Sequence, residues 1–100
     1  MADPRRQTGI DDVLAAKGYQ QLTSISATTA LTVPGGSTVA MIQAEAQAVR
    51  WRDDGTNPTA SVGMNLAAGQ TMWYTGPLAS IKFIQVTSGA IVNVSYYGVS

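Results

Sequence analysis

Turn-forming residues recur at roughly eight- to twelve-residue intervals from Gln20 onward, and this spacing constrains the fold more than any other feature. The runs between the turns are short and rich in β-branched residues, as is typical of a β-sandwich or barrel. Among the turn signals are Pro34-Gly35-Gly36, Asp53-Asp54-Gly55, Ala67-Ala68-Gly69, Gly76-Pro77 and Ser88-Gly89. The sequence therefore predicts an all-β fold, a small antiparallel β-sandwich or jelly-roll-like barrel with an N-terminal arm and a short helix.

The first 18 residues differ from the rest of the chain. Residues 1–9 have no apolar period, which predicts an arm. Thr8 and Asp11 have the spacing of a helix-capping pair, and Gly18 suits the residue that follows a helix. We therefore divide the chain into an arm with a short helix, residues 1–18, and a β domain, residues 19–100.

Three apolar residues, Ile10, Val13 and Leu14, fall on one face of the expected helix. A helix of about two turns is not stable alone in water, so this face must pack against another surface. We expect these three residues to bind a partner, which is either the β domain itself or another subunit.

Charge is distributed unevenly. The six basic and six acidic residues cancel, so no overall field favours nucleic acid or a membrane as partner. After Asp54 the only charged side chain is Lys82. An uncharged half of this kind is either a hydroxyl-rich soluble surface or a surface covered by neighbouring subunits.

The last strand shows how such a surface could be built. Val92, Val94 and Tyr96 alternate with a more polar set, so one set should face the core and the other should face outward. A register shifted by one residue would instead put the valines outward. We expect self-association through the more polar set, which is Ile91, Asn93, Ser95 and Tyr97.

Catalytic chemistry has few candidate residues. Histidine and cysteine are absent, which removes the commonest general base, zinc ligands and a thiol nucleophile. Asp53 and Asp54 are adjacent and are typical of a turn, and Arg50 and Arg52 are typical of charges on an edge strand, with Trp51 facing the core between them. The sequence predicts no enzyme activity, no cofactor and no metal.

The segment from Ala48 to Thr56, followed by Val62-Gly63-Met64, Ala67-Ala68-Gly69, Trp73-Tyr74 and the closing run from Val92 to Tyr97, resembles small virion proteins of tailed bacteriophages. The resemblance covers about residues 20 to 98. It implies a non-enzymatic capsid decoration (cement) protein, favoured as a homotrimer, that binds and stabilises the shell of the phage major capsid protein. Such a protein is located on the capsid surface of the virion and is assembled in the cytoplasm of the host bacterium.

Two alternatives remain open. The same resemblance fits a component of the phage neck or tail. A module of a different class, one that binds carbohydrate, would use Trp51, Trp73 and Tyr74 as an aromatic platform. Exposed and coplanar tryptophans would favour carbohydrate binding, whereas buried ones would favour the virion proteins.

Overall fold

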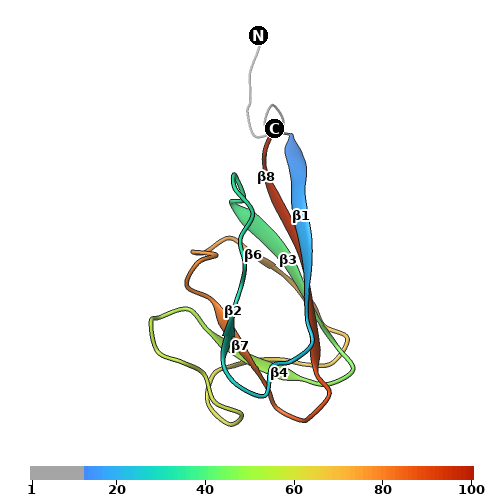
Figure 1. Ribbon diagram of the computed structural model, residues 1–100, viewed down its shortest axis with the longest axis vertical. Coiled ribbons are helices and arrows are strands. Elements are labelled where there is room, and N and C mark those ends of the chain that lie inside the picture. The colour runs from blue at the N-terminus through green and yellow to red at the C-terminus, as the bar shows by residue number, and fades with distance from the viewer. Residues whose placement is uncertain (1–12) are drawn as a thin grey trace.

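A computed structural model describes residues 13–100 and shows two four-stranded antiparallel sheets that pack face to face (Figure 1). The first sheet has the strand order β1-β8-β3-β6, and the second has the order β2-β7-β4-β5. The strands are β1 (Leu14–Leu22), β2 (Thr29–Ala30), β3 (Val39–Glu45), β4 (Val49–Arg52), β5 (Met64–Leu66), β6 (Thr71–Tyr74), β7 (Lys82–Gln85) and β8 (Ile91–Val99). The predicted all-β antiparallel sandwich is confirmed.

Strand β8 organises the first sheet because it pairs with β1 on one side and with β3 on the other. Its side chains alternate between the core and the outward side of the sheet, and Val92, Val94 and Tyr96 are completely buried. The predicted alternation is therefore confirmed, and the register shifted by one residue is excluded. Figure 1 shows β1 and β8 running together along the long axis of the molecule.

The core lies between the two sheets and is mainly aliphatic. The Tyr96 hydroxyl donates to Gln20 Oε1 at 2.8 Å, and burial raises the pKa of Tyr96 to about 12. Trp51 packs against the core from the end of β4 without being fully enclosed. The buried apolar residues are Leu22, Ile25, Ala40, Ile42, Ala44, Val49, Leu66, Tyr74, Leu78, Ile81, Phe83, Ala90, Val92, Val94 and Tyr96.

The prediction of a short N-terminal helix is wrong for the residues that the structure describes, because residues 14–17 belong to β1. A two-turn helix gains little from its capping residues, whereas β8 offers these residues a ladder of backbone hydrogen bonds. The proposed boundary between residues 18 and 19 also falls inside β1, so the β domain includes the chain from Leu14. Ile10 lies outside the described residues.

The loop between β2 and β3 approaches β8 closely at Gly98. A Cβ atom on Gly98 would collide with the carbonyl oxygen of Gly36. Next to this contact, the Thr38 amide donates to the Tyr97 carbonyl at 2.9 Å, so the loop cannot simply move away.

We expect Gly98→Ala to lower the free energy of unfolding by about 1 to 3 kcal/mol, the usual cost of overpacking. Urea denaturation followed by circular dichroism would measure the loss. Gly35→Ala is the matched control, since a Cβ there meets no atom within 4 Å. Equal stability of the two variants would contradict the close contact.

Candidate functional site

The outward-facing side of the first sheet gathers polar and aromatic side chains from all four strands. The strand register places them in two rows across the sheet. One row is Tyr19, Ser95, Met41 and Trp73, and the next is Gln21, Asn93, Gln43 and Thr71. These eight residues, together with Tyr97, are called the outer face below.

Asn93 is the centre of the outer face, where it links β1 to β3. Its Oδ1 accepts hydrogen bonds from the Tyr19 hydroxyl at 2.7 Å and from Gln21 Nε2 at 2.9 Å. Its Nδ2 donates to Gln43 Oε1 at 3.2 Å and to Glu45 Oε1 at 2.7 Å. The amide thus makes all four hydrogen bonds that an asparagine side chain can form, and its orientation is fixed.

Aromatic side chains stand at both edges of the outer face. Tyr19 on β1 is 64% exposed and Trp73 on β6 is 55% exposed. Trp73 contacts Tyr97, with ring centroids 5.5 Å apart and planes tilted by 50°. Between the two edges lies a shallow depression of about 200 Å³, with Ser95 in its floor. The outer face therefore contains a trough that Tyr19 lines on one side and amide, hydroxyl and methionine side chains line elsewhere, while Trp73 stands beside the trough without lining it.

The outer face carries no charged side chain of its own. Within residues 13–100, Glu45 at the end of β3 is the carboxylate that bonds to it, through Asn93. Such a surface offers mainly hydrogen bonds and apolar contact. Over residues 13–100 no group of three or more carboxylate, imidazole or thiol side chains is placed to bind a metal ion.

Charge is concentrated instead on the second sheet. Arg50 and Arg52 alternate along β4 with residues that face the core, and Lys82 lies opposite Arg52 on β7. The hydrogen bond from Arg52 lowers the pKa of Asp54 and raises the pKa of Arg52 itself. The interpretation of the two arginines as edge-strand charges is wrong for Arg50, because β4 lies between β7 and β5 there; Arg52 lies one residue beyond the last pairing with β5.

The structure places the predicted site residues in two regions. Ile91, Asn93, Ser95 and Tyr97 all lie on the outward side of β8, in one line. Val13 and Leu14 are exposed near the end of the β1–β8 ribbon, where Leu14 pairs with the exposed Val99.

The predicted aromatic platform of Trp51, Trp73 and Tyr74 does not exist as one surface. Tyr74 is buried and contacts Trp51 edge to face, with centroids 5.9 Å apart, while Trp73 points to the other side of β6. Sequence reasoning missed the remaining outer-face residues, since they belong to strands whose pairing partners are distant in the chain. The alternation of Tyr19 and Gln21 with Gln20 and Leu22 was the available signal.

Comparisons of the chain with protein-family models, with curated proteins and with solved structures found no match. Among residues 13–100 there is no helix that is both long enough and apolar enough to cross a membrane. The geometry of the outer face, together with the sequence, is thus the basis for a functional proposal.

Proposed function

We propose that the chain is a non-enzymatic virion structural protein, a capsid decoration protein that assembles through its outer face and stabilises the shell of a phage major capsid protein. The single observation that carries the proposal is the composition of the outer face. Tyrosine, tryptophan and methionine lie there beside fixed amides, without charge, and this is the composition of a protein interface. The resemblance noted in the sequence supplies the virion context.

The size of the outer face suits an assembly that depends on several contacts. The four strands have 9, 9, 7 and 4 residues, and with a rise of about 3.4 Å per residue and a spacing of about 4.8 Å they give an area of about 470 Å². Stable interfaces bury about 800 Å² on each partner, so this face alone gives modest association. A homotrimer that also binds the shell gains its strength from the combination of weak contacts.

The exposed end of the β1–β8 ribbon is our candidate for the shell contact. Val13 and Leu14 point into solvent there beside Val99, so a partner can cover them without any change in the core. Deleting residues 1–18 would remove half of β1 and disturb the sheet, so point variants are the better test.

We expect the double variant Val13→Ser/Leu14→Ser to remain folded and to bind phage capsids with at least about tenfold lower occupancy, because two apolar contacts are lost. Quantitative gels of purified particles measure the copies bound. Val86→Ser, on the turn after β7, is the matched control for an exposed apolar residue. Wild-type binding at about six to twelve copies per particle would contradict decoration and favour the neck or tail.

A second candidate function is binding of a neutral carbohydrate in the trough. It is favoured by the exposed Tyr19, which lines the trough beside amides and hydroxyls, and by the exposed Trp73 at the other edge of the sheet, since sugars stack on aromatic rings and bond to amides. A chain that stays monomeric, and whose Trp73 fluorescence changes with neutral oligosaccharides, would favour this function over assembly.

A further inference from the structure

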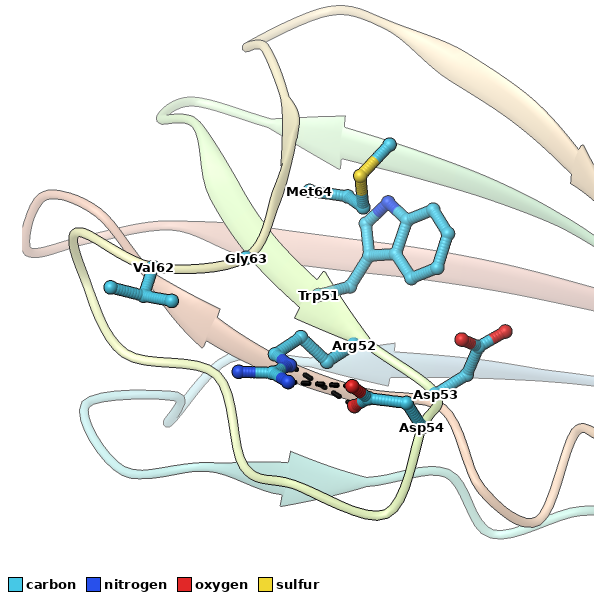
Figure 2. Close-up of a pocket in the computed structure, with 7 residues that line it drawn as sticks. All are labelled: Trp51, Arg52, Asp53, Asp54, Val62, Gly63 and Met64. Atoms are coloured by element: carbon cyan, nitrogen blue, oxygen red, sulfur yellow. Dashed lines mark hydrogen bonds and ion pairs between the residues drawn. The ribbon is translucent and has the colours of Figure 1, made fainter.

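A separate cavity of about 250 Å³ lies beside the end of β4 and shares no lining residue with the outer face (Figure 2). It forms because β5 pairs with β4 only as far as Trp51, opposite Met64. At the preceding residue, Gly63, the chain bends with a φ of 145°. A Cβ there would lie 3.1 Å from the Trp51 carbonyl oxygen, so the bend brings the chain close to β4. The end of β4 is thereby left without a β5 partner.

The walls of the cavity are apolar and accessible. Figure 2 shows the Trp51 ring beside Met64, with Val62 across the bend at Gly63. Val62 is 54% exposed and Met64 is 60% exposed. Cavities that bind whole small molecules measure about 300 to 1,000 Å³, so this one is sized for a single long side chain. Such pockets, with a tryptophan wall, are typical anchor points of protein interfaces.

The other end of the cavity carries a carboxylate, Asp53, that has no ion pair within residues 13–100. Arg50 also lies nearby, where its Nη1 donates to the Gly63 carbonyl oxygen at 3.0 Å, so the two arginines and two aspartates around the cavity balance in charge. Arg52 donates to both carboxylate oxygens of Asp54, which makes that pair neutral (Figure 2). The neighbouring Asp53 accepts a hydrogen bond from the Tyr74 hydroxyl through Oδ2, at 2.6 Å. Within residues 13–100 no donor bonds to Asp53 Oδ1. One carboxylate oxygen therefore remains open to a cationic donor.

We propose that this cavity binds one lysine side chain of a partner protein. The aliphatic stem would pack against Trp51, Val62 and Met64, and the ammonium group would bond to Asp53. Lysine is the side chain that combines a long apolar stem with a compact positive head. The ammonium also gains from the nearby indole ring. This site is distinct from the outer face and does not depend on assembly there.

The chemistry of the cavity disfavours the other kinds of side chain that a partner protein could insert. A carboxylate side chain would be repelled by Asp53. A purely apolar side chain would displace water from Asp53 without replacing its hydrogen bond, which is unfavourable. Arginine binds best when both carboxylate oxygens are open to its planar fork, and Tyr74 already holds one of them.

The test uses the full chain labelled with ¹³C in its methionine methyl groups, with Met64 assigned through Met64→Leu. Three peptides are titrated: acetyl-Gly-Lys-Gly-amide and the analogues with norleucine or arginine in place of lysine. We expect the Met64 methyl signal to shift saturably with the lysine peptide, about tenfold more tightly than with norleucine. Asp53→Asn keeps an acceptor for Tyr74 and should abolish that preference. Glu45→Gln, which removes a carboxylate from the other sheet, should leave it unchanged.

Equal affinity for lysine and norleucine, or tighter binding of arginine, would overturn the proposal, as would an unchanged preference in Asp53→Asn. The occupant could instead be Lys17 of a second copy. In that case the Met64 signal would shift with protein concentration alone and would stop shifting in Lys17→Met, and the external partner would be rejected.

Discussion

Ser95→Lys is expected to convert the assembled protein to monomers while leaving the β-sheet circular-dichroism signal intact. Ser95 lies in the middle of the outer face, between Tyr19 and Met41. A lysine there would be repeated in every copy, and each ammonium would be desolvated and close to the others. Asn93→Asp should act similarly, because it removes both Nδ2 donors and puts a second carboxylate beside Glu45.

Analytical ultracentrifugation over a range of protein concentrations would measure this effect. Ser61→Lys is the matched control. Ser61 is exposed in the loop before β5, a strand of the second sheet, whereas the outer face belongs to the first sheet. We expect that control to sediment as the wild type does. A wild-type chain that is a clean monomer at high micromolar concentration would contradict self-association and leave binding to an external partner.

Phe83→Ala should cause the largest loss of stability, about 3 to 5 kcal/mol, as is usual when a buried aromatic side chain is removed. Phe83 is completely buried on β7, with Thr29 and Trp51 as its neighbours across the strands. Trp51→Ala should cost less, because Trp51 lies at the margin of the core and its neighbours can partly fill the space.

Urea denaturation of the two variants would compare them directly. Tryptophan fluorescence, from Trp73 alone in Trp51→Ala and from both tryptophans in Phe83→Ala, and circular dichroism should give coincident transitions if unfolding is two-state. A loss for Trp51→Ala that equals or exceeds that for Phe83→Ala would show that the end of β4 is part of the core. That outcome would also mean that Trp51, which forms one wall of the cavity, is required for the stability of the fold.

Alternation made β8 predictable, whereas β1 shows where sequence reasoning fails. In β8 the buried valines and Tyr96 give a period of two with no competing helical pattern. Around residues 10–18 the capping residues and apolar spacing favoured a helix, but the pairing of β1 with β8 is a contact between the two ends of the described chain and leaves little local signal. Local preference was overridden by tertiary hydrogen bonding.

The candidate site was predicted only in part for a related reason. Asn93, Ser95 and Tyr97 lie on one strand, so their common direction follows from alternation alone. The position of Trp73 beside Tyr97 depends on the pairing of β3 with both β6 and β8, which no short-range pattern specifies. The cavity at β4 depends on the bend at Gly63. Many residues of that segment are typical of turns, so the presence of one glycine among them does not predict where the chain bends or that a cavity forms there.

The central position of β8 also affects how the protein is made. Leu14 pairs with Val99, and β3 pairs with the other side of β8, so the first sheet lacks its middle strand until β8 has left the ribosome. Before that point β1 and β3 have no neighbour between them, and their apolar sides stay open to solvent or to chaperones. Pairings so distant in sequence also close slowly. The first sheet therefore forms only after β8 has emerged from the ribosome, and any surface built across β1, β8 and β3 becomes available to partners only from that point.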